Sequence, residues 1–250
     1  MRITAKMLID SMVGNLNQTL ARLEKTQRQV STGQKMNRPS DNPVSVAHAL
    51  ALQSTLSQNR QYLRNVDAAT AWLNTTDASL SGVVDAIHRA KELAVRGGND
   101  TLSTDQRRAI AREVEEIIGS VVESGNSTYQ GLYIFSGTRT LTPAFAYTAG
   151  DPGVVYNGDG NKMQRQVGLG ATVEVNITGD QALPTVFSGL IALRDGLLDN
   201  SSSAVQAAGA QLDQALNDVL EARAQVGARV NRLEAISTQL TGVEISLSEL

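Results

Sequence analysis

The sequence predicts a mainly helical fold with a β-rich insert in the middle of the chain. Three observations lead to this prediction. Apolar residues recur at coiled-coil spacing near both ends of the 250-residue chain. A proline-free stretch at residues 44–96 repeats apolar residues at helical spacing. Glycine, threonine, tyrosine and valine become more frequent at residues 131–179. Because the two helical ends can pair, we expect an elongated helical trunk with a small outer β domain.

The first predicted helix carries a narrow apolar stripe. Its members alternate spacings of four and three, with Gln27 as a polar interruption. They are Ile9, Val13, Leu16, Leu20, Leu23 and Val30. Gly33 follows where a C-cap glycine belongs. Such a stripe is too narrow to bury a globular core, so the helix needs a partner. Periodicity alone leaves two interpretations open, the stem of a monomer or an interface for assembly.

A proline-containing segment, Pro39-Ser40-Asp41-Asn42-Pro43, separates this helix from the next. Asn42 is a good N-cap and Pro43 a good first helical residue. As one helix, residues 44–96 would extend for about 80 Å. Asn74-Thr75-Thr76 favours a helix end, so a break there is the alternative. Ser103 and Gln106 have capping-box spacing, which predicts a third helix that ends near Gly125-Asn126.

The insert contains several strand patterns. Leu132 to Phe135 is predicted as a strand, and Thr172 to Ile177 as a half-buried strand because apolar and polar residues alternate. Val154 to Tyr156 and Met163 to Val167 flank Asn157-Gly158-Asp159-Gly160, which predicts a hairpin turn. Asn157, Asp159 and Asn161 also match the first positions of a calcium loop, but Gly168 replaces the final glutamate, so the hairpin is favoured.

The chain is predicted to return to helices after the insert. A short helix near residues 184–198 and a loop at 200–203 precede a last helix with its own heptad frame, interrupted by Arg223, Ser237 and Glu244. That frame comprises Leu212, Leu216, Val219, Val226, Val230, Leu233, Leu240 and Leu247. We expect the last helix to pack against the second. The residues expected at this trunk contact are Leu63, Val66, Leu73, Leu80, Val226, Val230 and Leu233.

Four segments follow from this pattern. Residues 1–40 form an N-terminal helix and linker, 41–130 the N-terminal part of the trunk, 131–182 the β-rich outer domain, and 183–250 the C-terminal part of the trunk.

The composition and the motifs argue against an enzyme and against a metal or cofactor site. The net charge of -3 disfavours nucleic-acid binding, and no apolar run is long enough to span a membrane. There is no cysteine, and the low aromatic content of 4% disfavours a small-molecule pocket. His48 and His88 have no ligand partner at helical spacing, so both are expected on helix surfaces. Nucleotide-binding and hydrolase motifs are missing. We therefore predict no enzyme activity, no metal and no cofactor.

Specific strings resemble the bacterial flagellin superfamily, and within it the hook-associated proteins. They are Met1-Arg2-Ile3-Thr4, the segment 31–43 with Arg38-Pro39-Ser40-Asp41-Asn42-Pro43, the segment 89–96, the segment 126–138 with Tyr133-Ile134-Phe135-Ser136-Gly137-Thr138, and the segment 224–233. The resemblance covers nearly the whole chain in order. It favours assembly as the role of the first apolar stripe.

The resemblance implies a structural protein that joins the flagellar hook to the filament as a mechanical adaptor. It implies export in an unfolded state through the flagellar type III apparatus and an extracellular location. The implied partners are copies of the chain, another hook-associated protein, flagellin and an export chaperone. The family's last helix continues further, so a missing or shortened C-terminal inner helix is expected here. A filament flagellin is the close alternative, and a helical signalling rod is an alternative from another class.

Overall fold

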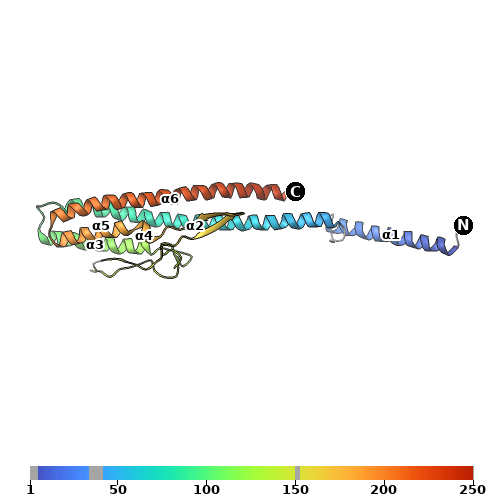
Figure 1. The fold of residues 1–250 in the computed structure, drawn as a ribbon, viewed down its shortest axis with the longest axis horizontal. Coiled ribbons are helices and arrows are strands. Elements are labelled where there is room, and N and C mark those ends of the chain that lie inside the picture. Colours follow the sequence, from blue (N-terminus) through green and yellow to red (C-terminus); the bar gives the residue numbers. More distant parts are fainter. Residues whose placement is uncertain (1–4, 34–41, 150–152, 250) are drawn as a thin grey trace. The chain divides into compact units, whose positions relative to one another are not determined.

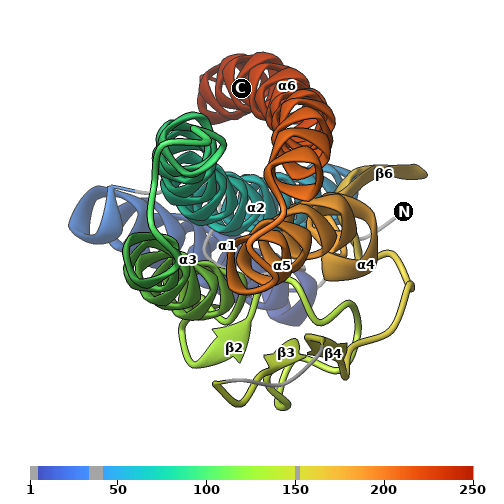
Figure 2. The same ribbon diagram turned by 90° about the vertical axis from the view of Figure 1, so that its left-hand side faces the viewer.

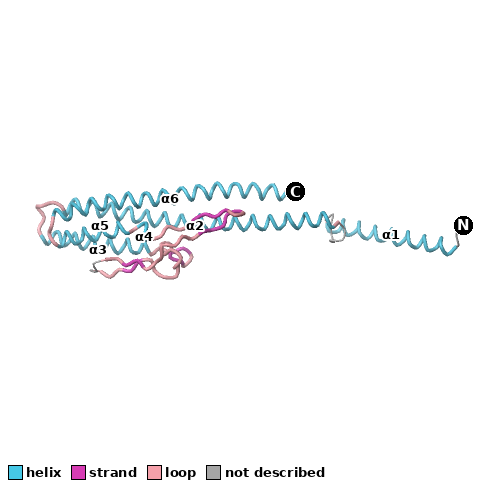
Figure 3. The backbone as a smooth tube through the Cα atoms, viewed as in Figure 1, coloured by secondary structure: helices cyan, strands magenta, loops and turns pink. Residues whose placement is uncertain are grey.

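The computed structural model describes residues 5–33, 42–149 and 153–249. Helices lie at both ends of the chain and short strands in its middle, so the predicted fold class is confirmed (Figures 1 and 3). The helices are α1 (Ala5–Thr32), α2 (Pro43–Gly97), α3 (Thr104–Gly125), α4 (Gly179–Ala182), α5 (Pro184–Leu198) and α6 (Ser202–Ser248). The strands are β1 (Thr128–Tyr129), β2 (Leu132–Tyr133), β3 (Phe145–Ala146), β4 (Val155–Tyr156), β5 (Gln164–Gly168) and β6 (Ala171–Glu174).

The chain divides into two units, residues 1–58 and residues 59–250, and the boundary lies inside α2. The first unit holds α1 and the first turns of α2. The second unit holds the rest of α2 and every later element. The segment boundaries at residues 40, 130 and 182 remain sequence-based predictions.

Local signals set the ends of the first two helices. Gly33, just after α1, has a φ of +66°, a left-handed conformation that glycine adopts without a steric penalty. α2 begins at Pro43, and the side-chain oxygen of Asn42 accepts a hydrogen bond of 3.2 Å from the backbone N–H of Ser45. The end of α1 and the start of α2 therefore agree with the predictions from the sequence. The segments 1–4 and 34–41, which include parts of the family-like strings, lie outside the described residues.

α2 is one helix of 55 residues, so the break considered at Asn74-Thr75-Thr76 is wrong. The hydroxyls of Thr75 and Thr76 donate to the carbonyl oxygens of Ala71 and Trp72, both at 3.0 Å. Each hydroxyl therefore satisfies its hydrogen-bonding need inside the helix instead of ending it. Burial of Leu73 and Leu80 on both sides of this segment stabilises the helical conformation.

The second unit is built around four helices. In the end-on view, α3 and α5 lie beside α2 and α6, and the strands β2, β3 and β4 lie on one side of this group (Figure 2). We call α3, α5, α6 and the part of α2 from Asn59 the trunk, and residues 126–178 the knob. α5 packs against both α3 and α6. Its bounds and the capping box of α3 at Ser103 and Gln106 agree with the prediction.

The knob contains three antiparallel strand pairs, β1–β2, β3–β4 and β5–β6. The predicted hairpin turn at Asn157–Gly160 is wrong, because β4 pairs with β3 and β5 pairs with β6. The side chain of Asp159 instead accepts hydrogen bonds from the N–H and hydroxyl of Thr138, at 2.7 and 2.5 Å. These bonds tie the segment to a distant loop. The hairpin turn of β5–β6 lies at Leu169-Gly170, where Gly170 has a φ of +70°.

The other strand predictions are confirmed in part. β2 ends at Tyr133, and the next two residues, Ile134 and Phe135, are buried without strand pairing. β6 ends at Glu174, although Val173, Val175 and Ile177 are all buried as the alternation predicts. Asn176 is buried as well, because its side-chain amide bonds the backbone of Met163 and Asn161, at 2.7 and 3.0 Å.

Candidate assembly surfaces

The stripe of α1 is exposed throughout. The exposed fractions of its predicted interface residues are 60% for Ile9, 51% for Val13, 63% for Leu16, 54% for Leu20, 63% for Leu23 and 79% for Val30. Met7, Leu8 and Met12 are exposed on the same helix. Isolated exposed apolar residues are ordinary, whereas a contiguous row of them on one helix marks a surface that a partner covers. No described residue of the chain buries this stripe.

α2 and α6 run antiparallel along the trunk, and four polar contacts set their register. Asn59 donates to the carbonyl oxygen of Leu240 at 2.8 Å, and Arg60 pairs with Glu244 at 2.8 Å. Further along, Asp77 pairs with Arg223 at 2.9 Å, and Lys91 with Asp213 at 2.5 Å. As the residue number rises along α2, the number of its partner on α6 falls. The two helices therefore keep one register over more than thirty residues of α2, from 59 to 91.

Most of the residues assigned to the trunk contact lie in the core. Val66, Leu73, Leu80, Val226 and Leu233 are buried, and Leu63 and Val230 are half-buried. The pairing register places Leu73 opposite the region of Val226, and Leu80 opposite the region of Val219. Their direct contact stays a proposal, consistent with this register. The sequence analysis did not predict the small members of the buried α6 stripe. They are Ala208, Ala215 and Ala222, which alternate with large residues.

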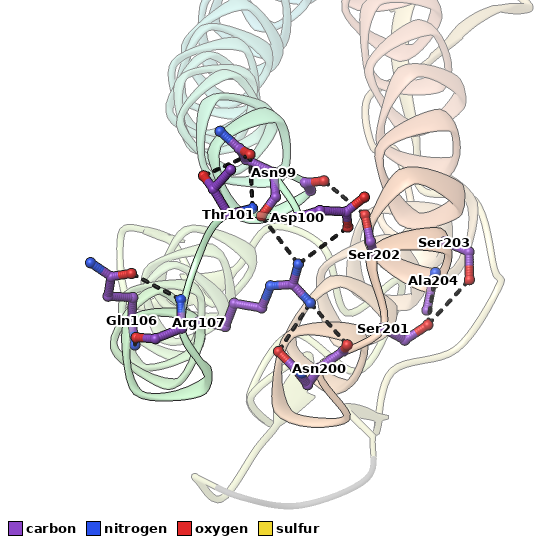
Figure 4. Close-up of polar contacts among 12 residues, drawn as sticks. Asn99, Asp100, Thr101, Gln106, Arg107, Asn200, Ser201, Ser202, Ser203 and Ala204 are labelled. Atoms are coloured by element: carbon purple, nitrogen blue, oxygen red, sulfur yellow. Dashed lines mark hydrogen bonds and ion pairs between the residues drawn. The ribbon is translucent and has the colours of Figure 1, made fainter.

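A buried arginine closes the end of the trunk, where the α2–α3 and α5–α6 loops meet (Figure 4). Arg107 is 3% exposed. Its guanidinium donates to the backbone and side-chain oxygens of Asn200, at 2.9 and 3.0 Å, and to the carbonyl oxygen of Asn99 at 3.1 Å. Asp100 lies 3.6 Å away. Asn200 has a φ of +55°, a left-handed conformation that asparagine adopts more readily than most residues.

A second polar cluster attaches the knob to the trunk. The hydroxyl of Tyr147 donates to the carboxylate of Glu115 on α3 at 2.6 Å, and Arg194 on α5 donates to that hydroxyl at 3.0 Å. Burial, and then the bond to Glu115, raise the pKa of Tyr147. The phenol therefore stays protonated at neutral pH and can donate.

The β5–β6 hairpin makes its own contacts with both long helices. The side chain of Asn65 on α2 donates to the carbonyl oxygen of Gln166 at 2.8 Å. Arg229 on α6 donates to the carbonyl oxygen of Asn176 at 2.8 Å and pairs with Glu174 at 3.0 Å. Sequence periodicity could not reveal these contacts, because each joins residues that are far apart in the chain.

The described residues show no candidate metal centre. Among residues 5–33, 42–149 and 153–249 there is no group of three acidic or histidine side chains placed to hold a metal ion. His48 and His88 are exposed on α2, as expected. Within the same residues, no helix is both long enough and apolar enough to cross a bilayer. The features that this geometry offers are exposed apolar and charged surfaces.

Residues 3–140 match the family model of the bacterial flagellin N-terminal helical region. This chain belongs to the bacterial flagellin family. It is therefore similar to structural proteins of the bacterial flagellum, where family members assemble with other flagellar components. The flagellin-type trunk accounts for the long antiparallel helices, and the knob is the β-rich insert between them.

Two curated relatives are flagellar hook-associated protein 3 of Escherichia coli and of Salmonella typhimurium. Each is 28% identical to this flagellin-family chain, over 95% and 100% of the chain and over 83% and 88% of the relative. A filament core protein of Treponema maltophilum is 25% identical over 84% of the chain and 70% of its own length.

Solved structures share the fold. A protein from Vibrio parahaemolyticus has a TM-score of 0.78 at 23% identity, covering 85% of this chain and 98% of its own. FlgL of Bacillus cereus has a TM-score of 0.70 at 23% identity, covering 81% and 99%. Flagellin of the same species has a TM-score of 0.53 at 18% identity, covering 71% and 88%.

Proposed function

We propose that this protein is a junction subunit that joins the flagellar hook to the filament. The observation that carries the proposal is the exposed apolar stripe of α1 in a chain whose trunk already buries its own core. Similarity to hook-associated protein 3 along 95% of the chain or more supports the junction as the place of assembly.

In this proposal, Ile9, Leu16 and Leu23 and their neighbours pack against helices of neighbouring subunits. Burying a large aliphatic side chain contributes about 1.5–3 kcal/mol, so one stripe supplies a strong contact when it is fully covered. The partners are copies of this chain, another hook-associated protein and flagellin. An export chaperone covers apolar surface before secretion, and the subunit leaves the cell unfolded through the flagellar export apparatus to an extracellular position.

A filament flagellin is the second candidate, and it has specific support. Several relatives at 24–27% identity are filament proteins. The two candidates differ in what a deletion does. Loss of a junction protein leaves hooks without filaments, although flagellin is still made and secreted. Loss of the filament protein removes flagellin itself. Electron microscopy of a null strain, together with an immunoblot for secreted flagellin, decides between them. Cells that keep attached filaments would contradict the junction proposal.

The role of the α1 stripe is tested by Leu16→Asp combined with Leu20→Asp. Two carboxylates placed in a packed interface lose hydration without gaining a partner. We expect the purified variant to melt like the wild type, because the stripe lies outside the trunk core, and to be secreted without restoring filaments to the null strain. Asn15→Asp with Gln18→Asp is the matched control, since it adds two charges outside the stripe. A stripe variant that restores full filaments would refute the interface. A variant that unfolds would indicate that the stripe belongs to the stem of the monomer's own fold.

A further inference from the structure

One turn of the knob presents an apolar side chain to water although its backbone is firmly held. The N–H of Thr142 donates to the carbonyl oxygen of Arg139 at 3.1 Å, which closes a four-residue turn. The N–H of Tyr133 donates to the carbonyl oxygen of Thr140 at 2.8 Å, and Asp159 anchors Thr138. At the tip of this turn Leu141 is 81% exposed. A preordered loop with an exposed leucine loses little entropy when it binds a partner.

The same turn carries a cation. Arg139 is exposed and has no ion-pair partner among the described residues. Arg139 and Leu141 are the first and third residues of this β-turn, so the charge and the apolar group belong to one turn. The docking turn, residues 138–142, therefore offers one apolar group beside one positive charge.

A groove between β3–β4 and α5 offers the complementary surface. Its volume is about 660 Å³, and its lining includes Phe145, Val154, Tyr156, Phe187, Ile191 and Ala192. The rings of Phe145 and Phe187 are 5.0 Å apart and form an aromatic floor. Ile191 and Ala192 extend this surface along α5. An aliphatic side chain that enters would lie against this apolar lining and leave water.

The carboxylate-bearing residue Asp180 lies next to this aromatic surface. A Cβ atom added to Gly179 would lie 2.5 Å from the ring of Phe145, so the backbone passes directly against the aromatic floor. Asp180 is the next residue, lines the groove and is exposed. It has no ion-pair partner among the described residues. The groove thus places a negative charge beside an apolar surface, which is opposite in charge to the docking turn.

We propose that the docking turn of one copy of this chain binds in the groove of a second copy, with Leu141 on the Phe145–Phe187 floor and Arg139 beside Asp180. The contact joins two different surfaces, so it propagates around a ring or helix and does not close as a symmetric dimer. It rests on the proposed assembly of the protein with its own copies. One turn in one groove buries less than a stable interface of about 1,200 Å² needs, so this contact is weak by itself and gains strength within an assembly.

Cysteine cross-linking tests this contact cleanly, because the chain has no cysteine of its own. Purified full-length Leu141→Cys and Ser188→Cys proteins are mixed under oxidising conditions, Ser188 being an exposed residue in the lining of the groove. We expect at least fivefold more disulfide-linked dimer in this mixture than in either protein alone. Leu169→Cys mixed with Ser188→Cys is the control, since Leu169 is 92% exposed at the tip of the β5–β6 hairpin.

Charge reversal supplies the second readout. Arg139→Asp added to the Leu141→Cys protein should lower the cross-linking yield several-fold, and so should Asp180→Arg added to the Ser188→Cys protein. Combining both reversed proteins should restore the yield, because the ion pair is re-formed with opposite polarity. A yield equal to that of the Leu169→Cys control, or a failure of the reversed pair to recover, would overturn the proposal. Filament restoration by the same variants reports on the proposed function separately, so the two failures can be told apart.

Discussion

At the scale of single residues, the buried polar groups join parts of the chain that are distant in sequence. Arg107 connects the α2–α3 loop to the α5–α6 loop, and Asn59 fixes the pairing of α2 with α6. A buried polar group contributes specificity because any other register leaves its hydrogen bonds unmade. These residues therefore decide how the helices align, while the apolar residues supply most of the stabilisation.

We expect Arg107→Ala to lower the free energy of unfolding by about 3 kcal/mol, because three oxygen acceptors lose their buried donor. The neighbouring Arg108→Ala is the control. Arg108 is exposed and 3.7 Å from Asp105, so its loss should change stability by no more than about 0.5 kcal/mol. Urea denaturation of both variants measures the difference. Equal effects would mean that the Arg107 contacts do not close the trunk.

The hydrogen bonds between Asp159 and Thr138 should stabilise the fold less at low pH. Hydrogen bonds from the hydroxyl and the N–H of Thr138 lower the pKa of Asp159 from 3.8 to about 2. Because the folded pKa is depressed, the stabilisation is complete above the unfolded pKa and is lost as the pH falls through about 4 to 2. Wild type should therefore melt at a higher temperature than Asp159→Asn at pH 7, and the gap should narrow over that acidic range. A gap that stays constant down to pH 2 would contradict this assignment.

At the scale of elements, α6 shows how small residues make a helix contact. Its buried stripe alternates large residues such as Leu212 and Val226 with Ala208, Ala215 and Ala222. Alanine brings the helix backbones close together and leaves room for the large residues of neighbouring helices. The sequence-based frame placed Leu216 and Val230 in the seam instead. Both are only half-buried, because they lie at the edge of the stripe.

Leu233 tests the frame of α6, since it is fully buried near the end of the trunk. Leu233→Ala removes buried methyl groups and leaves a cavity, which should cost about 2–5 kcal/mol. Leu220→Ala is the matched control on the same helix, because Leu220 is 44% exposed. Thermal or urea unfolding of both variants gives the comparison. A loss below about half a kcal/mol for Leu233→Ala would place this residue on a solvent-facing side and refute the frame.

At the scale of the whole molecule, the two units differ in where their apolar residues lie. The second unit buries most of its large aliphatic residues in one continuous core. In the first unit, α1 exposes its entire stripe. A helix without tertiary packing is marginal in water, so order in α1 depends on the partner that covers it.

Hydrogen exchange of the isolated protein should show this difference. We expect amides of α1 to exchange much faster than those of α2 between residues 59 and 97, because local opening of α1 breaks no core contacts. Exchange followed by proteolysis and mass spectrometry resolves both segments in one experiment. Equal protection of α1 and the trunk part of α2 in a monomeric sample would contradict the interpretation.

The sequence by itself determined where the long helices lie, the starts of α2 and α3, and the family. Periodicity, Pro43 and the Ser103–Gln106 capping box act over a few residues, so local reasoning locates them. Only the tertiary structure decided the strand pairing of the knob, the alanine half of the α6 stripe and the contacts of Arg107. The physical reason is distance along the chain. Asn157–Gly160 favours a tight turn locally, but the bonds of Asp159 to Thr138, twenty-one residues away, hold that segment in another conformation.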